Sequence, residues 1–192
     1  MISMNDALRL IEERRDDAVV FPASVGSRGW SEVSHDPSLD VPTGVMSKAS
    51  SVALGLCLAR PDRKVVVLDG DGGLLMNLGS LVTIGGQAPE NLYHFVLDNG
   101  MYATTGGQPV PNAEGFDFAG LAGAAGYARA FEFDDLEEFA TSVDEVMNSK
   151  GPVLVCLKTV PEVENLPIGL RPRGKTRRPK DAIKGIFEEL NR

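Results

Sequence analysis

The chain has few cysteines, few histidines and a deficit of positive charge. Its 192 residues include two cysteines and two histidines, and no Cys-x-x-Cys pair occurs. This composition argues against a zinc or iron–sulfur cage and against a disulfide framework. Cys57 and Cys156 lie in apolar runs, which is typical of buried thiols in a reducing compartment. The net charge of −8 argues against nucleic acid or an anionic membrane as a partner.

Long apolar runs are also missing. The longest uncharged stretch, residues 72–89, contains five glycines and several polar side chains, so it does not fit a membrane span. The N-terminus lacks the basic-then-apolar pattern of a signal peptide. We therefore expect a cytoplasmic protein that does not associate with membranes.

Short β-branched segments alternate with helical segments along the chain, and 43% of the residues are hydrophobic. The pattern predicts strands at 18–21, 64–68, 93–97, 127–133 and 152–157. It predicts helices at 5–15, 48–59, 74–84, 118–125, 134–148 and 180–190. Residues 24–42 and 99–115 are rich in turn-forming residues and are expected to be loops. This alternation predicts an α/β fold of three layers (αβα) with a doubly wound, mostly parallel sheet.

The C-terminal end differs in charge from the rest of the chain. Residues 171–180 contain six lysines and arginines, whereas the chain as a whole is acidic. We expect one domain over residues 1–170, followed by a basic tail at 171–192 with a terminal helix. The tail is a solvated terminus by default, and it could also dock on a partner or attract an anionic substrate.

A glycine-rich turn follows the predicted strand at 64–68. It contains Gly70, Asp71, Gly72 and Gly73, and glycines let the backbone approach a ligand such as a phosphate closely. The turn matches neither a Walker loop nor the dinucleotide fingerprint. Because a carboxylate repels phosphate unless a cation lies between them, Asp71 indicates a divalent cation, and Mg²⁺ suits oxygen ligands.

A second polar turn follows the strand at 93–97. It begins with Asp98 and Asn99. The carboxyl ends of neighbouring parallel strands meet at one edge of a sheet, so Asp71 and Asn99 can share one metal ion, and a carbonyl near Met101 could add a ligand. Either motif alone is commonly just a turn, but the two together make a stronger case for a site.

The combination of Gly70-Asp71-Gly72 with Asp98-Asn99 resembles the thiamine diphosphate motif, normally GDG followed by NN. Residues 18–160 resemble the diphosphate-binding (C-terminal) domain of thiamine diphosphate-dependent decarboxylases, above all the β subunit of sulfopyruvate and phosphonopyruvate decarboxylases. Asp98 departs from the motif, because the family usually has asparagine there. The family's metal ligand is the second residue of the pair, here Asn99.

The resemblance implies a thiamine diphosphate-binding fold and a set of site residues. Asp71 and Asn99 would bind Mg²⁺ through their side chains and Met101 through its carbonyl group. The carbonyl of Gly44 would accept a hydrogen bond from the cofactor's aminopyrimidine, and Met46 would wedge beneath the cofactor. Met46 could equally be an ordinary core residue. The implied cofactor-binding residues are Gly44, Met46, Gly70, Asp71, Gly72, Gly73, Asn99, Met101 and Tyr102.

The resemblance also implies a partner. In the family, a catalytic glutamate lies on a separate pyrimidine-binding domain, and this chain is long enough for one domain only. The expectation is a split decarboxylase of a small anionic 2-oxo acid, with a pyrimidine-binding α subunit in an α2β2 heterotetramer. Of the two histidines, His94 is expected to be structural, and His35 is a weak candidate for acid–base catalysis.

Three other functions remain open at this stage. The chain could belong to a carboligase, such as an acetolactate-forming synthase. It could belong to a 2-oxoacid oxidoreductase, although the absence of clustered cysteines argues against that class. It could also be a non-catalytic regulatory homologue, which the retained Asp71 and Asn99 argue against.

Overall fold

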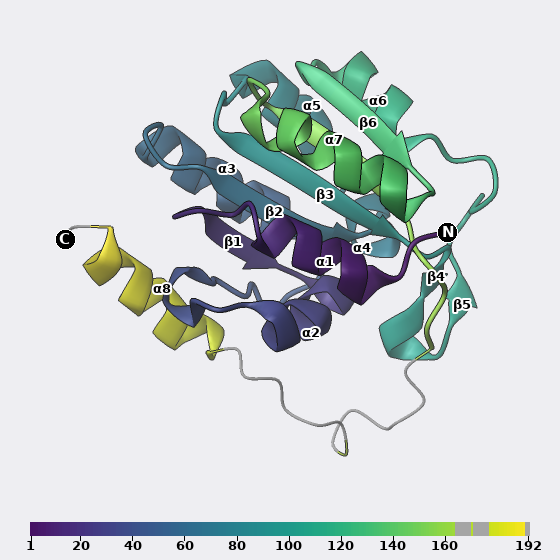
Figure 1. The fold of residues 1–192 in the computed structure, drawn as a ribbon, viewed down its shortest axis with the longest axis horizontal. Coiled ribbons are helices and arrows are strands. Elements are labelled where there is room, and N and C mark those ends of the chain that lie inside the picture. Colours follow the sequence, from purple (N-terminus) through teal and green to yellow (C-terminus); the bar gives the residue numbers. More distant parts are fainter. Residues whose placement is uncertain (164–169, 171–176, 191–192) are drawn as a thin grey trace.

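A parallel sheet forms the centre of the molecule (Figure 1). The computed structural model describes residues 1–163, 170 and 177–190. Five strands lie in the order β1-β2-β3-β7-β6, and every neighbouring pair is parallel. The strands are β1 (Val19–Pro22), β2 (Val65–Gly70), β3 (Leu92–Asp98), β6 (Arg129–Phe133) and β7 (Val153–Lys158).

Helices cover both faces of this sheet, which confirms the three-layer α/β fold. One face is covered by α1 (Met4–Glu12), α2 (Ser24–Val33) and α7 (Leu136–Asn148). The other face is covered by α3 (Ala49–Ala59), α5 (Ser80–Gln87), α6 (Phe118–Ala125) and α8 (Pro179–Glu189). A short helix, α4 (Asp71–Leu75), starts at the end of β2.

The strand register aligns the functional ends of the sheet. All residues of β2 and β3 are buried, as expected for central strands covered on both faces. Gly70 at the end of β2 pairs with Leu97, and Asp98 at the end of β3 pairs with Lys158 of β7. The turns that follow β2 and β3 therefore leave the sheet at the same edge.

The helices follow from local sequence signals. The side chain of Asp135 caps α7 by accepting hydrogen bonds from the N–H groups of Glu137 and Glu138. The buried face of α7 then repeats at helical spacing, through Phe139, Val143 and Val146. This helix packs against the sheet on the side opposite to α3.

The expectation of a loop over residues 24–42 is wrong. This segment contains α2 and a short 3-10 helix, η1 (Pro37–Leu39). The glycines that suggested a loop allow close packing instead. A Cβ atom on Gly26 would lie 3.1 Å from the Leu68 carbonyl oxygen, and one on Gly29 would lie 2.6 Å from a methyl group of Leu8. Tertiary packing therefore offsets the low helix propensity of glycine.

Two other segments differ in detail from the prediction. The helix expected over 74–84 is divided into α4 and α5, with turns between them. The segment 99–115 is not wholly irregular, because it contains a small antiparallel hairpin of β4 (Met101–Tyr102) and β5 (Gln108–Pro109) around the 3-10 helix η2 (Ala103–Thr105).

The C-terminal helix α8 packs on the main body of the molecule. Ile186 joins the apolar layer beneath α3, and the Arg177 guanidinium donates a 2.6 Å hydrogen bond to the Ser38 carbonyl. Most of the basic segment, residues 171–176, lies outside the described residues, so its predicted roles stay predictions. Within the part of the chain that the structure describes, no helix is both long and apolar enough to cross a bilayer.

Candidate functional site

The two polar turns predicted to form a site lie next to each other. Asp71 starts α4, and its carboxylate reaches across to the turn after β3. The N–H of Gly72 donates to Asp71 Oδ1 and the N–H of Gly100 donates to Asp71 Oδ2, both at 2.7 Å. The amide oxygen of Asn99 accepts a 3.1 Å hydrogen bond from the Met101 N–H. The structure therefore brings Asp71 and the Asn99 turn together at one edge of the sheet.

Asp98 stands where the family motif usually has asparagine, and Lys158 compensates its charge. The Lys158 ammonium lies 2.7 Å from Asp98 Oδ2, and the remaining Asp98 oxygen accepts from the Gly100 N–H at 3.3 Å. Burial lowers the pKa of Lys158, but the hydrogen bond that its ammonium donates to Asp98 and the neighbouring negative charges outweigh this effect, so the net pKa is raised. Lys158 sits at the end of the next strand along the sheet, a partner that the sequence analysis missed.

The Asp71 carboxyl group is 2% exposed, and its environment does not favour the charged form. Burial raises its pKa, the neighbouring Asp98 raises it further, and the two backbone N–H donors oppose the shift. The net result is a pKa of about 7. Among the described residues, one ammonium group, that of Lys158, lies close to these two carboxyl groups, which leaves a local excess of negative charge when both are ionised. A divalent cation would relieve it.

The glycine-rich turn packs tightly against its surroundings. A Cβ atom on Gly72 would lie 2.6 Å from a ring carbon of Tyr102, so the tyrosine ring covers this position. A Cβ atom on Gly73 would lie 2.8 Å from Asp69 Oδ1. Side chains at either position would displace these groups, which explains why glycine is needed at both.

A small cleft collects most of the predicted cofactor-binding residues. Seven of the nine line it, namely Met46, Gly70, Asp71, Gly72, Gly73, Met101 and Tyr102. The wedge role of Met46 stays a prediction, but its position beside the glycine turn agrees with that role.

Ser24 also lines this cleft, and the sequence analysis did not single it out. It is the first residue of α2 and is separated from β1 by Ala23 alone. Its backbone is left-handed (φ +50°), and its buried Oγ has no hydrogen-bond partner among the described residues. A strained backbone and a buried hydroxyl without a hydrogen bond both reduce the stability of the folded state, and such features are common at ligand-binding sites. Because ligands bind at the carboxyl ends of parallel strands, the segment after β1 was expected to border a site. No local sequence pattern identified Ser24 as the residue involved.

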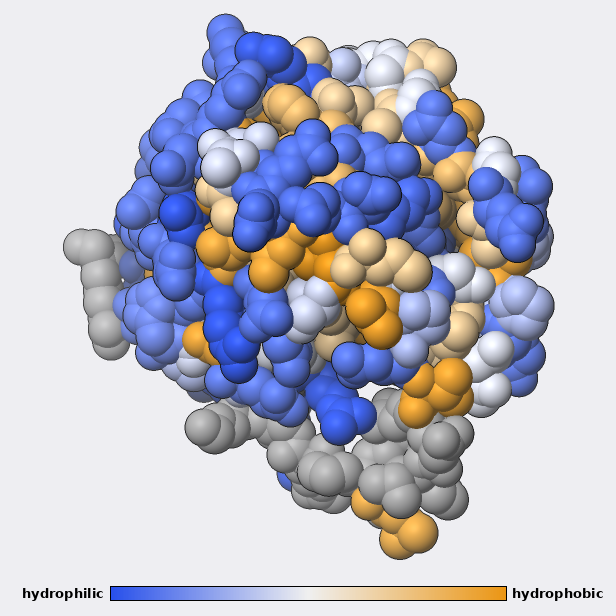
Figure 2. Space-filling view, turned by 45° about the vertical axis from the view of Figure 1, so that its right-hand side comes forward, coloured by the Kyte–Doolittle hydropathy of each residue, from blue (hydrophilic) through white to orange (hydrophobic). Residues whose placement is uncertain are grey.

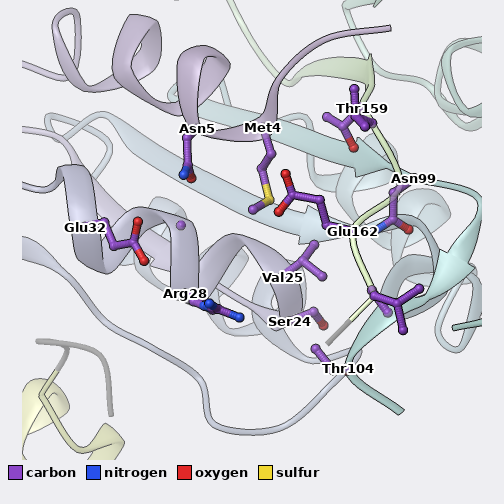
Figure 3. Close-up of a pocket in the computed structure, with 14 residues that line it drawn as sticks. Met4, Asn5, Ser24, Val25, Arg28, Glu32, Asn99, Thr104, Thr159 and Glu162 are labelled. Carbon is purple, nitrogen blue, oxygen red and sulfur yellow. The ribbon is translucent and has the colours of Figure 1, made fainter. Parts of the chain in front are cut away.

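A larger cavity of about 330 Å³ adjoins the cleft (Figure 3). The two share Ser24, Val25, Ala103 and Thr104. Asn99 borders the cavity at one end, whereas Arg28 and Glu32 of α2 border it at the other. In the view turned toward this edge of the sheet, an apolar band crosses a largely hydrophilic surface (Figure 2).

Two predicted residues lie elsewhere. Gly44 has the left-handed backbone (φ +66°) expected at a tight turn, but it packs against Pro179 of α8, with 2.7 Å between Pro179 Cγ and the position of a Cβ atom. His35 contacts Glu12 through its ring and through its backbone N–H, which donates at 2.7 Å. As the described residues form them, neither the cleft nor the cavity includes Gly44 or His35.

The donor set fits a hard cation that also binds a ligand. Among the described residues, no group of three or more His, Cys, Asp and Glu side chains is arranged to hold a metal ion by itself. A cation beside Asp71 would therefore need the Asn99 amide, a backbone carbonyl and oxygen atoms from a bound molecule. That combination is typical of Mg²⁺ with phosphate. The orphaned hydroxyl of Ser24 supplies a donor for such a phosphate.

The fold and this arrangement of strand-end groups define the class of protein. Residues 37–157 match the family described as the C-terminal TPP-binding domain of thiamine pyrophosphate enzymes. The match covers more than half of the chain, so the chain belongs to this family. The family resemblance seen in the sequence is confirmed.

Comparison with individual proteins shows which members of the family resemble this chain. The chain is 37% identical over 153 residues to sulfopyruvate decarboxylase subunit beta of Methanothermobacter thermautotrophicus, which covers 80% of this chain and 79% of that subunit. It is 39% identical over 152 residues to phosphonopyruvate decarboxylase of Streptomyces viridochromogenes, which covers 79% of this chain. The chain spans only 38% of that relative, and 29% of the phosphonopyruvate decarboxylase of Streptomyces hygroscopicus.

A solved structure supports the fold. A candidate thiamin diphosphate-dependent enzyme from Mycobacterium smegmatis superposes with a TM-score of 0.71 at 20% identity, covering 84% of this chain and 32% of that chain. At this identity the likeness shows that the two chains share a fold.

Proposed function

We propose that this chain is the diphosphate-binding subunit of a split, thiamine diphosphate- and Mg²⁺-dependent decarboxylase of 2-oxo acids. The partner is a pyrimidine-binding α subunit that supplies the catalytic glutamate, and the assembly is an α2β2 heterotetramer located in the cytoplasm. The match to most of a sulfopyruvate decarboxylase subunit beta supports a separate subunit. The substrate class is a small anionic 2-oxo acid, such as sulfopyruvate or phosphonopyruvate, after the relatives' names.

One observation carries the proposal. Asp71 is a buried carboxyl group that accepts hydrogen bonds from two backbone N–H groups and shares a side-chain hydrogen bond with a second carboxyl group, that of Asp98, and no cationic side chain pairs with it among the described residues. A structural carboxylate at such a depth is ordinarily paired with a cationic side chain. Asp71 has no such partner among the described residues, so a bound cation would supply the missing positive charge, and the site lies where parallel sheets bind ligands.

Each residue of the site has a defined task in this proposal. Asp71, Asn99 and the Met101 carbonyl hold the cation, and Ser24 donates its hydroxyl to a phosphate oxygen. Gly72 and Gly73 bring the backbone close to the diphosphate. Met46 supports the cofactor rings, and Tyr102 covers the glycine turn. When bound, thiamine diphosphate supplies a thiazolium ring that accepts the electron pair released as CO₂ leaves the substrate.

The test is reconstitution. The chain would be co-expressed with a candidate pyrimidine-domain subunit and assayed for CO₂ release from sulfopyruvate, phosphonopyruvate and pyruvate. We expect release only from the mixture, and only with Mg²⁺ and thiamine diphosphate. Turnover by the chain alone would contradict the split enzyme. A ligated product in place of CO₂ and an aldehyde would favour a carboligase.

A further inference from the structure

A polar chain lies buried behind the glycine turn. Asp69, His94 and Tyr127 are all buried, and the first two are fully buried. The phenol oxygen of Tyr127 lies 3.1 Å from His94 Nδ1, and His94 Nε2 lies 3.7 Å from Asp69 Oδ2. Asp69 lies on β2, His94 lies on β3 and Tyr127 lies two residues after the end of α6, so segments distant in the sequence meet here.

The surroundings of this polar chain are apolar. Val67 of β2 and Val96 of β3 belong to the hydrophobic layer under α3, α5 and α6, and Asp69 and His94 project from the same strands in phase with them. Tyr127 belongs to that layer. A buried carboxylate and a buried imidazole in such a layer cost free energy.

Asp69 contacts the turn that carries Asp71. Its Oδ1 accepts a 3.0 Å hydrogen bond from the Gly70 N–H, and the same atom lies directly beneath Gly73. Its other oxygen, Oδ2, faces His94 Nε2, and neither of these two atoms has a closer partner among the described residues. The carboxylate of Asp69 therefore connects the glycine turn on one side with His94 on the other.

His94 can join its two neighbours because its ring has a nitrogen on each side. With the proton on Nε2, the ring directs an N–H at Asp69 and accepts the Tyr127 phenol proton at Nδ1. Tyr127 is anchored in turn, because its backbone N–H donates to the Ala122 carbonyl at 3.0 Å. The polar side chains thus connect the segment just after α6 with the glycine turn.

We propose that Asp69 is a positioning residue for the cofactor turn, and that His94 and Tyr127 hold Asp69 in the orientation that the turn requires. This inference rests on the proposed function. It predicts that affinity for Mg²⁺-thiamine diphosphate depends on a tyrosine that lies outside both the cleft and the cavity as the described residues form them.

The test separates positioning from ordinary stability. The unfolding temperature of the full chain, alone and mixed with the pyrimidine-domain subunit, would be measured without ligand and across a titration of Mg²⁺-thiamine diphosphate, which yields an apparent Kd. Asp69→Asn should raise that Kd at least about tenfold and Tyr127→Phe several-fold. Because Tyr127 acts through Asp69, the double variant should bind no more weakly than Asp69→Asn alone.

Tyr93→Phe is the matched control. Tyr93 is a buried tyrosine on the same strand as His94, but it lies on the opposite face and donates to the Ser149 carbonyl at 2.9 Å. Its loss should lower the unfolding temperature without changing the Kd. Equal Kd values for wild type and Tyr127→Phe would overturn this inference. So would a rise in Kd with Tyr93→Phe as large as that with Tyr127→Phe. Either result would leave the proposed function standing. Absence of binding by wild type, both alone and in the complex with the α subunit, would overturn the proposed function, and the inference with it.

Discussion

Among the residues that the structure describes, two clusters of buried carboxylates are balanced by positive charge in different ways. In the first, Asp40 is 2% exposed and lies 3.2 Å from the guanidinium of Arg15, which is fully buried. Trp30 Nε1 and the Ser34 hydroxyl donate to the same carboxylate, at 2.9 Å and 2.6 Å. Glu12 completes the cluster on the other side of Arg15. This cluster carries its own cation.

The second cluster, Asp71 and Asp98, is equally deep but lacks a full set of counter-charges. Lys158 pairs with Asp98, and among the described residues no cationic side chain pairs with Asp71. Burial and then the neighbouring Asp98 raise the pKa of Asp71, and among the described residues no cationic partner of Asp71 offsets them. The comparison shows that burial alone does not distinguish a structural acid from a binding acid. The source of the balancing charge distinguishes them.

The largest expected effect is a loss of stability when the buried Arg15 guanidinium is removed. Arg15→Met leaves Asp40 and Glu12 buried without their partner, which should destabilise the chain by about 3–5 kcal/mol. Urea unfolding measures the change. Arg14→Met is the control, because Arg14 pairs with two exposed acids and its loss should cost less than about 1 kcal/mol. Similar losses for the two variants would show that the Arg15 cluster is not structurally important.

Removal of the Asp71 carboxylate, which has no cationic partner among the described residues, should weaken ligand binding without destabilising the fold. Asp71→Ala should weaken binding of Mg²⁺-thiamine diphosphate by at least about 100-fold, while the metal-free chain unfolds at a similar or higher temperature. Calorimetric titration and thermal unfolding measure the two effects. Asp144→Ala, at an exposed acid, should change neither. A wild-type affinity for Asp71→Ala would remove the metal assignment.

The pH dependence of the metal-free chain sharpens the comparison. The Asp71 carboxyl takes up a proton near pH 3.8 when unfolded and near pH 7 when folded. Between these values the folded chain binds more protons, so its stability falls as pH rises. Wild type should therefore lose ~2 kcal/mol relative to Asp71→Ala between pH 5 and pH 7. Parallel stability curves for the two proteins across this range would contradict the raised pKa.

The smallest effect concerns Lys158. Lys158→Met should destabilise the chain by about 1–2 kcal/mol, because Asp98 loses its ammonium partner. The double variant Lys158→Met/Asp98→Asn should recover most of this loss, since it removes the buried charge as well. Lys150→Met, at an exposed pair with Glu90, should change stability by less than about 0.5 kcal/mol. No recovery in the double variant would mean that the pair with Asp98 is not what Lys158 contributes.

Local sequence signals predicted much of the fold. The unbroken apolar runs that became β2, β3 and β7 and the cap at Asp135 are local features, so the strands and α7 appear close to their predicted positions. The helix α2 was not predicted because its glycines lower the helix propensity of the segment. These glycines allow α2 to pack closely against Leu8 and Leu68, a contact that only the tertiary structure shows.

The sequence by itself determined the parallel α/β class and the meeting of Asp71 with the Asn99 turn, because consecutive parallel strands end at the same edge of a sheet. Only the tertiary structure decided which cations balance which acids and which hydroxyl remains unsatisfied. Arg15, Lys158 and Ser24 owe their roles to neighbours from distant segments. Electrostatic interactions and hydrogen bonds depend on distance and burial, and no local pattern encodes either.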